Sequence, residues 1–397
     1  MSTVSVVGGV YGEECAFPLR KQVFGSAGRA AAALSPHFGS VTLHTLLPEP
    51  AASRISPNFD AYGVDVVLHG GSQFISFDYL HCLAEPQIHP KPSQIEQQAS
   101  FHVEGDLIIQ FGMMECQPTV NADICVYDPQ SPSSPISFSK SGSQAKRLAF
   151  VANAGEIELL TGKPVDEGAQ LLVHSEDAEV VVAKCGLAGA KVFSKDGFVG
   201  AVPAYKTTSV FTVGSGDIFV AAFALAWGQL GLSPLEAADY ASRSVAAYVE
   251  TEARELPPIK GIQEVHRETV KLTGGNIYLA GPFRELGQRV IVNEARKVLL
   301  GLGMEVFSPV HDIGHGPAEA VVAKDLQAIR DCDAVLAIIN GSSPGTLFEV
   351  GFAVALGKPV VCVAQNMRSN DTKLPKGAGC TVHDDLISAA HLLAWRG

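Results

Sequence analysis

The chain lacks closely spaced cysteines. None of its 8 cysteines belongs to a Cys-x-x-Cys pair, and they are scattered over 397 residues. Structural zinc sites and disulfide frameworks both depend on regular cysteine spacing. The pattern therefore argues against both, and it indicates a reducing compartment. We expect a cytoplasmic protein.

The chain also lacks a long hydrophobic run. Its most apolar stretch, residues 218–227, is about half of the roughly 20 residues that a membrane span needs. The first residues contain no basic segment followed by an apolar core, so we expect no secretory signal. No membrane association is predicted.

Positive charge is in short supply as well. Lys and Arg total 29 against 41 Asp and Glu, which gives a formal net charge of −12. Nonspecific binding to a nucleic-acid backbone is therefore disfavoured. A small anionic ligand is still possible, because a helix N-terminus can bind it locally. We expect small-molecule ligands and no nucleic-acid partner.

The chain is rich in short β-branched runs that alternate with Ala- and Leu-rich helical patterns. Examples of the strands are residues 179–183 and 334–339, and examples of the helices are residues 234–248 and 285–302. This alternation is typical of parallel sheets covered by helices. At roughly 100–200 residues per domain, the length predicts two or three domains.

A candidate domain boundary lies in residues 251–275, which are rich in charge, contain Pro-Pro and end in Gly-Gly. We therefore predict a first α/β domain over residues 1–256, a linker over 257–275 and a second, smaller α/β domain over 276–397.

The second domain contains a strand, a Gly/Ser/Pro turn and a helix that we expect to start near Thr346. Glu349 then lies in the first helical turn, where the helix dipole stabilises a carboxylate by about 0.3–1 kcal/mol. An ionised carboxylate at the ligand edge of a parallel sheet suits nucleophilic attack on an anomeric carbon. The alternative is that Glu349 only caps the helix.

Ordered motifs in residues 276–364 support the catalytic alternative. They are Tyr278, Gly281-Pro282-Phe283, Asp325 with Cys332-Asp333 after it, and Gly345-Thr346-x-Phe348-Glu349-x-Gly351. In this order they resemble the nucleoside 2-deoxyribosyltransferase family and the related deoxynucleoside 5′-monophosphate N-glycosidases.

That resemblance implies a smaller, doubly wound parallel-sheet domain of Rossmann or flavodoxin type that needs no cofactor. It implies Glu349 as the nucleophile, Asp325 in acid/base and sugar contacts, and Tyr278 as the residue that positions the nucleophile. Because related transferases complete their sites from a neighbouring subunit, it also implies a homo-oligomer. The implied substrate-binding residues are Gly281, Pro282, Phe283, Ser343, Gly345 and Thr346.

Ser343 departs from the transferase pattern, in which many members have Asp at this place. A hydroxyl cannot act as a carboxylate base at neutral pH, so base exchange is less expected than hydrolysis. Serine also occurs here in the nucleotide-hydrolysing relatives, where it can hydrogen-bond a 5′-phosphate.

In the first domain, residues 211–227 predict a Gly-rich turn followed at once by an apolar helix. The backbone N–H groups of Gly214, Ser215 and Gly216 can bind a phosphate. Asp217 could accept a proton from a substrate hydroxyl, which contributes roughly 10²–10⁴-fold to a rate. The alternative is an N-capping Asp after a flexible turn.

Two further motifs are Asn153-x-x-Glu156 and the turn Gly186-x-x-Gly189 that follows Lys184. Together with Gly214-Ser215-Gly216-Asp217 they resemble the ribokinase-like (PfkB) sugar and nucleoside kinases. The resemblance implies a ribokinase-like α/β sandwich that uses ATP and Mg²⁺. In that resemblance Asp217 is the catalytic base, and no residue is a direct metal ligand; Mg²⁺ is organised through the Asn153/Glu156 region. The implied ATP- and phosphate-binding residues are Gly214, Ser215, Gly216, Asn153, Glu156, Lys184, Gly186 and Gly189.

The acceptor half of this domain fits that family poorly. Kinases of the family usually have Gly-Gly followed four residues later by Asn in the sugar site, and here Phe24 replaces the first Gly and Arg29 replaces the Asn. Phe211 replaces an acidic residue. These changes predict either a different substrate, with Arg29 meeting an anionic group, or a domain that binds its ligand without phosphorylating it.

The sequence as a whole predicts a bifunctional enzyme of nucleoside or nucleotide metabolism. The C-terminal domain would cleave an N-glycosidic bond or transfer deoxyribose through Glu349, and the N-terminal domain would phosphorylate a sugar or nucleoside with ATP. The alternative is a single-activity N-glycosidase whose degenerate kinase-like domain only binds ligand or mediates assembly. Ligand sensing without turnover is less expected.

Overall fold

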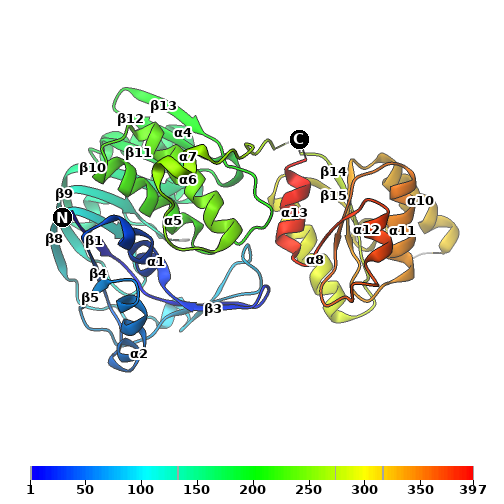
Figure 1. Cartoon of the computed structure of the whole chain (residues 1–397), viewed down its shortest axis with the longest axis horizontal. Helices are drawn as coiled ribbons and strands as arrows, with labels where there is room; N and C mark the ends of the chain where they lie inside the picture. The colour runs from blue at the N-terminus through cyan, green and yellow to red at the C-terminus, as the bar shows by residue number, and fades with distance from the viewer. Residues whose placement is uncertain (1, 132–133, 273, 315–316, 397) are drawn as a thin grey trace. The chain divides into compact units, whose positions relative to one another are not determined.

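The computed structural model describes residues 2–131, 134–272, 274–314 and 317–396. The chain divides into two compact units, one made of Met1–Thr207 and Phe211–Val270 and the other of Thr208–Val210 and Lys271–Gly397 (Figure 1). Each unit has a large sheet with helices packed on it, so the two-domain α/β architecture is confirmed.

The first unit is built on a nine-stranded sheet in the order β13-β12-β11-β10-β9-β8-β1-β4-β5. Adjacent strands from β5 to β11 pair in parallel, whereas β11-β12 and β12-β13 pair antiparallel. The sheet is therefore mixed, whereas the sequence pattern predicted a parallel sheet. The strands are β1 (Thr3–Val7), β4 (Ser40–Thr45), β5 (Val64–Leu68), β8 (His102–Phe111), β9 (Thr119–Asp128), β10 (Gln144–Asn153), β11 (Val180–Lys184), β12 (Ala190–Ser194) and β13 (Gly197–Val202).

A second, four-stranded sheet in the order β3-β2-β6-β7 belongs to the same unit. Its strands are β2 (Gly12–Cys15), β3 (Arg20–Val23), β6 (Ser76–Tyr79) and β7 (Gln87–His89). We call these four strands the lid sheet. The sequence analysis did not predict it, because strands this short and polar show no apolar alternation.

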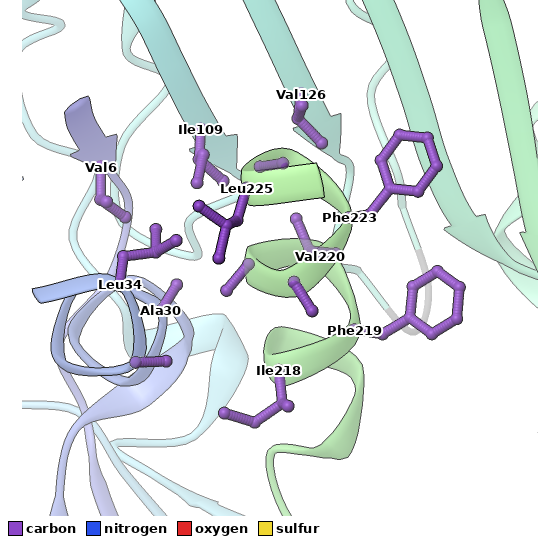
Figure 2. Close-up of a cluster of buried hydrophobic side chains, with 14 of the residues drawn as sticks. Val6, Ala30, Leu34, Ile109, Val126, Ile218, Phe219, Val220, Phe223 and Leu225 are labelled. Atoms are coloured by element: carbon purple, nitrogen blue, oxygen red, sulfur yellow. The ribbon is translucent and has the colours of Figure 1, made fainter. Parts of the chain in front are cut away.

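Helices cover both faces of the large sheet. Helices α1, α5 and α6 share one buried cluster with one face, and α3 and α4 contribute to the cluster on the other face. In Figure 2, Leu34 of α1 and Leu225 just after α5 lie against Val6 and Ile109 of the strands. The helices of this unit are α1 (Gly25–Leu34), α2 (Glu49–Asp60), α3 (Ala154–Thr161), α4 (Val165–Ser175), α5 (Ser215–Phe223), α6 (Pro234–Thr251) and α7 (Ile259–Glu264).

The second unit contains five parallel strands in the order β15-β14-β16-β17-β18. They are β14 (Asn276–Ala280), β15 (Glu305–Phe307), β16 (Ala334–Ile338), β17 (Val360–Val363) and β18 (Thr381–His383). The helices are α8 (Leu286–Gly301), α9 (Pro309–Asp312), α10 (Ala318–Asp331), α11 (Pro344–Ala355), α12 (Lys373–Gly377) and α13 (Leu386–Ala394).

This strand order is the doubly wound, flavodoxin-like order, in which ligands bind where the direction of winding reverses. The reversal lies between β14 and β16, and the segments that follow these two strands begin there. The fold therefore directs the search for a site to the carboxyl ends of β14 and β16.

No helix among the described residues is long and apolar enough to cross a membrane.

Candidate active sites

Tyr278 and Glu349 meet at the switch point of the second unit. Tyr278 is fully buried on β14, and its hydroxyl donates a hydrogen bond to Glu349 Oε1 at 3.0 Å. Glu349 projects from α11, the helix that follows β16. The two residues are 71 positions apart in the chain, and the parallel pairing of β14 with β16 is what brings their elements together.

The position of Glu349 in its helix differs from the expected one. Helix α11 begins at Pro344 and has no acidic residue in its first turn, so Glu349 lies in the second turn and does not cap the helix. The dipole effect falls off within the first turn, and burial instead raises the pKa of Glu349 to about 7, aided by the charge of Asp325 and opposed by the Tyr278 hydrogen bond. The expectation that Glu349 lies in the first helical turn is therefore wrong.

Asp325 completes this group from α10. Its charge contributes to the raised pKa values of both Tyr278 and Glu349, so the three side chains are electrostatic neighbours. Burial raises the pKa of Asp325 itself. Its Oδ1 atom is buried and has no hydrogen-bond partner among the described residues. A buried acceptor left unpaired is costly, and such atoms often await a ligand group.

The predicted substrate-binding residues fall into two sets. Gly281, Pro282 and Phe283 directly follow β14, but a Cβ on Gly281 would lie 2.8 Å from Val292 Cγ2, so this glycine serves close packing. Ser343, Gly345 and Thr346 surround the start of α11. Ser343 is the N-cap residue, yet its side chain makes no capping hydrogen bond among the described residues, and a Cβ on Gly345 would lie 4.0 Å from Ser343 Oγ. Thr346 is buried.

A hollow of about 350 Å³ lies beyond the carboxyl ends of β17 and β18, at the same edge of the sheet. Sequence reasoning did not find it, because its lining residues belong to no motif. It is lined by Ala364, Met367, Ser369, Thr372, Lys376, Val382, His383 and Asp384.

In the first unit, strand register gathers a second group of polar residues. Asp128, Asn153 and Lys184 are the last residues of the adjacent strands β9, β10 and β11. Lys184 Nζ donates to the fully buried Asp128 Oδ2 at 2.5 Å. Burial alone lowers the pKa of Lys184, but the carboxylates of Asp128 and Glu156 raise it above its usual value. The lysine therefore stays charged at this edge.

The predicted phosphate loop lies beside that lysine. Gly214 has φ +82° and precedes α5, and a Cβ on Gly216 would lie 3.6 Å from Lys184 Nζ. The Ser215 N–H donates to the Thr212 carbonyl at 3.0 Å. The start of α5 and an ammonium group are nevertheless close together, which suits an anion. Gly186 and Gly189 bound the turn after β11, and Gly189 lets the Val202 carbonyl approach, since a Cβ there would be 1.9 Å from its oxygen.

Asp217, the predicted base, is buried at the start of α5 with both carboxylate oxygens bound. Arg29 Nη1 donates to Oδ2 at 2.6 Å, and Gln130 Nε2 donates to Oδ1 at 2.6 Å. Arg29 Nη2 also donates to Glu13 of the lid sheet. Arg29 therefore contacts carboxylates of the protein itself. Sequence reasoning missed Glu13 and Gln130 because no motif marks them.

Asn153 and Glu156 form a reciprocal capping box at the start of α3. Asn153 Oδ1 accepts from the Glu156 N–H at 2.9 Å, and Glu156 Oε2 accepts from the Asn153 N–H at 2.8 Å. Burial and the charge of Asp128 raise the pKa of Glu156 to about 7. No group of three or more His, Cys, Asp or Glu side chains in the described parts of the chain is placed to hold a metal ion.

Comparisons with known families find a match in each unit. The pfkB carbohydrate kinase family matches residues 119–257, and the nucleoside 2-deoxyribosyltransferase family matches residues 277–386. The comparison with curated proteins gave no match.

Solved structures resemble the first unit. A fructokinase double mutant from Vibrio cholerae O395, with fructose, ADP and potassium bound, has 15% identity and a TM-score of 0.51, and the match covers 66% of this chain and 97% of that one. Ribokinase from Thermotoga maritima has 16% identity and a TM-score of 0.49, with 66% and 98% covered. A pyrophosphate-dependent kinase of the ribokinase family has 15% identity and a TM-score of 0.48, with 66% and 100% covered. The likeness to the fructokinase, together with the pfkB family match, shows that the first unit has the ribokinase-like fold.

Proposed function

We propose that this protein is an enzyme of nucleoside or nucleotide metabolism. The premise is that the chain joins a pfkB carbohydrate kinase domain to a nucleoside 2-deoxyribosyltransferase domain. The proposed reaction of the C-terminal domain is cleavage of the N-glycosidic bond between a base and its sugar. The observation that supports it best is the Tyr278–Glu349 hydrogen bond at the switch point, beside the unpaired Oδ1 of Asp325.

In the proposed mechanism, a Glu349 carboxylate oxygen attacks C1′ of the sugar while the bond from C1′ to the base nitrogen breaks. The departing base takes a proton, and Asp325 can supply it because burial raises the pKa of its carboxyl. A water molecule then attacks C1′, gives its proton to the Asp325 carboxylate and frees Glu349. Tyr278 holds Glu349 in one orientation throughout.

Hydrolysis is the preferred outcome, and a 5′-monophosphate fits the start of α11. Ser343 carries a hydroxyl in place of a second carboxylate, and that hydroxyl makes no capping bond. Together with the first N–H groups of α11, it can donate hydrogen bonds to a phosphate. We therefore propose deoxynucleoside or nucleoside 5′-monophosphates as preferred substrates over free nucleosides.

Chromatography of the free base released from ribo- and deoxyribonucleosides and their 5′-monophosphates tests this proposal. Glu349→Gln should abolish release, because the amide cannot form the glycosyl ester. Glu305→Gln, which changes an exposed residue of β15, is the matched control and should retain full activity. Equal rates in wild type and Glu349→Gln would refute the assignment.

For the N-terminal domain we propose binding of ATP with Mg²⁺ at the Gly214–Asp217 loop. Support comes from the N–H groups at the start of α5, the charged Lys184 beside Gly216, and the carboxylates of Asp128 and Glu156. Mg²⁺ usually binds through one or two carboxylates together with substrate phosphates, so we propose that Glu156 would meet a Mg²⁺ that the nucleotide carries. That ion would neutralise phosphate charge. Titration of MgATP into wild type and Lys184→Ala tests this binding, and equal affinity would contradict it.

Phosphorylation of a sugar or nucleoside by this domain is the second candidate function. The buried position of Asp217 at the phosphate loop favours it, because a base is needed there. Homo-oligomer formation, and any completion of the site by a second subunit, stay predictions.

A further inference from the structure

Arg29 occupies the centre of the acceptor side of the N-terminal domain. It lies on α1, its side chain is fully buried, and its guanidinium joins Asp217 of α5 to Glu13 of the lid sheet. The stem packs against the phosphate loop, since a Cβ on Gly214 would lie 2.2 Å from Arg29 Nε. The space between the predicted base and the lid sheet is therefore filled by the protein's own side chain.

Both carboxylate oxygens of Asp217 already bond protein donors. One oxygen bonds a guanidinium, which does not lose its proton in proteins, and the other bonds the amide of Gln130. Gln130 has φ +33°, in the left-handed region, so local backbone strain is tolerated where this contact is made. A base must come within hydrogen-bond reach of the hydroxyl that it deprotonates, and here the buried Arg29 side chain fills the space beside Asp217.

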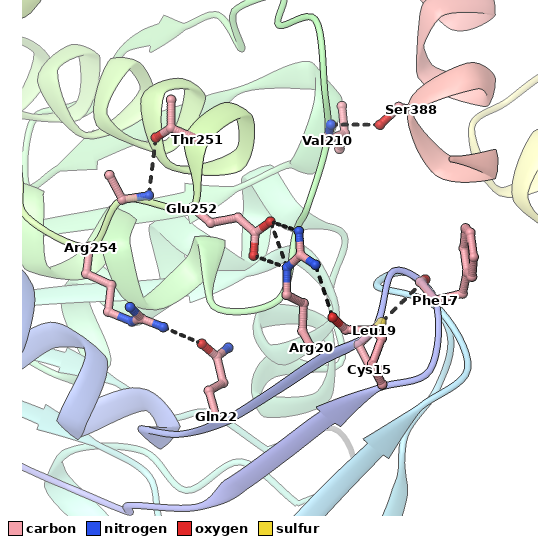
Figure 3. A network of polar contacts seen from close by, with 11 residues as sticks. Cys15, Phe17, Leu19, Arg20, Gln22, Val210, Thr251, Glu252, Arg254 and Ser388 are labelled. Carbon is pink, nitrogen blue, oxygen red and sulfur yellow. Dashed lines mark hydrogen bonds and ion pairs between the residues drawn. The ribbon is translucent and has the colours of Figure 1, made fainter. Parts of the chain in front are cut away.

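The same guanidinium fastens the lid sheet. Glu13 lies on β2 opposite Phe77 of β6. Two residues further along β6, the pKa of Tyr79 is raised by burial and by the charges of Glu13 and Asp217. At the surface, Arg20 of β3 forms a bidentate pair with Glu252, and Gln22 accepts from Arg254 at 2.7 Å (Figure 3). The buried Arg29–Glu13 pair is screened less by solvent than the Arg20–Glu252 pair.

We infer that Arg29 is a built-in occupant of the acceptor site, where it keeps Asp217 ion-paired and the lid sheet closed. As a result, the N-terminal domain binds a phosphate-bearing ligand without phosphorylating a sugar hydroxyl. This inference rests on the proposed phosphate site. It decides between the two candidate roles of the domain in favour of ligand binding. Two carboxylates facing one guanidinium also make the site selective against neutral sugars, because a sugar cannot replace the cation between them.

The first test measures phosphoryl transfer in the full chain. The background variant is Glu349→Gln, which prevents base release from consuming the acceptors. ADP formation is followed with MgATP and a panel of pentoses, hexoses, ribonucleosides and deoxyribonucleosides, with and without Asp217→Asn. We expect ADP formation to be the same with and without Asp217→Asn. ADP formation that is lost in Asp217→Asn would overturn the inference.

The second test measures lid closure by amide hydrogen exchange of the full chain without ligand. Arg29→Asn should speed exchange in peptides from residues 12–23 and 76–89 by about 10-fold or more, because local opening of the lid sheet becomes easier. Glu13→Gln keeps Arg29 and its bond to Asp217 and should give the same increase, so the test stands even where Arg29→Asn does not fold. Arg20→Gln, which breaks only the surface pair, is the matched control and should act on residues 20–23 alone.

Unchanged exchange in both Arg29→Asn and Glu13→Gln would overturn the inference. Titration of MgATP tests the proposed phosphate site separately, because the exchange experiment uses no nucleotide. A failure of that site and a failure of lid closure are thus distinguishable.

Discussion

Replacement of Glu349 by glutamine should stabilise the C-terminal domain while it abolishes activity. Burial raises the pKa of Glu349 from 4.5 to about 7 in the folded protein. Because the folded pKa lies above the unfolded one, the carboxyl favours folding while it is protonated, and this contribution is lost as the pH rises through 7. Each pKa unit corresponds to about 1.4 kcal/mol, so the ionised carboxylate destabilises the fold by up to about 3 kcal/mol at pH 8.

Glutamine has nearly the same shape and no charge, so it should remove most of that cost. We expect Glu349→Gln to raise the free energy of unfolding by about 1–3 kcal/mol at pH 8, and by less than about 1 kcal/mol at pH 5. Urea unfolding followed by circular dichroism at both pH values measures this difference, with Glu305→Gln as the exposed control. An equal effect of Glu349→Gln at pH 5 and pH 8 would refute the reasoning, because the carboxylate would then not be desolvated.

The remaining predictions concern the same site and the core of the first unit. Tyr278→Phe removes the hydrogen bond that lowers the pKa of Glu349. The acidic limb of the pH–rate profile for base release should therefore move to higher pH by up to about one unit. An unchanged limb would contradict the Tyr278–Glu349 hydrogen bond. Asp325→Asn should slow base release by roughly 10²–10⁴-fold, and the loss should shrink for substrates whose base leaves without protonation, which chromatography of released base can measure. Leu34→Ala should cost about 2–5 kcal/mol of stability in urea unfolding, because Leu34 is fully buried between α1 and the sheet; a cost below about 1 kcal/mol would mean that this side chain is not packed as described.

The sequence predicted the elements with strong periodicity, and it predicted the chemistry carried by local motifs. The strand expected at residues 179–183 is β11, and the helix expected at residues 234–248 is α6 and extends to Thr251. Parallel strands that are buried on both faces are continuous apolar runs, so they can be recognised without a partner. The antiparallel strands β12 and β13 and the lid sheet could not be placed, because their pairing is decided by tertiary contacts.

Long-range contacts account for what the sequence could not show at the two sites. Arg29 and Asp217 are 188 positions apart, and nothing in the local pattern of either indicates that they form an ion pair. In the same way, the pKa of Glu349 is raised by burial, and the side chain lies beyond the first turn of α11, where the helix dipole would act. Local motifs name candidate groups, whereas packing decides their protonation and their partners.

The two sites differ in how their carboxylates are satisfied, and this difference indicates where turnover takes place. A buried acceptor that stays unpaired destabilises the fold, so such an atom is expected where a bound ligand supplies the missing hydrogen bond. Among the described residues, Asp325 Oδ1 is an atom of this kind, and Glu349 accepts a hydrogen bond from the Tyr278 hydroxyl alone. Asp217 has a donor on each oxygen and is buried against Arg29, so a substrate hydroxyl would have to enter space that the Arg29 side chain fills. Base release should therefore persist at the wild-type rate in Asp217→Asn and vanish in Glu349→Gln; a rate that falls in both would mean that the N-terminal site takes part in the reaction.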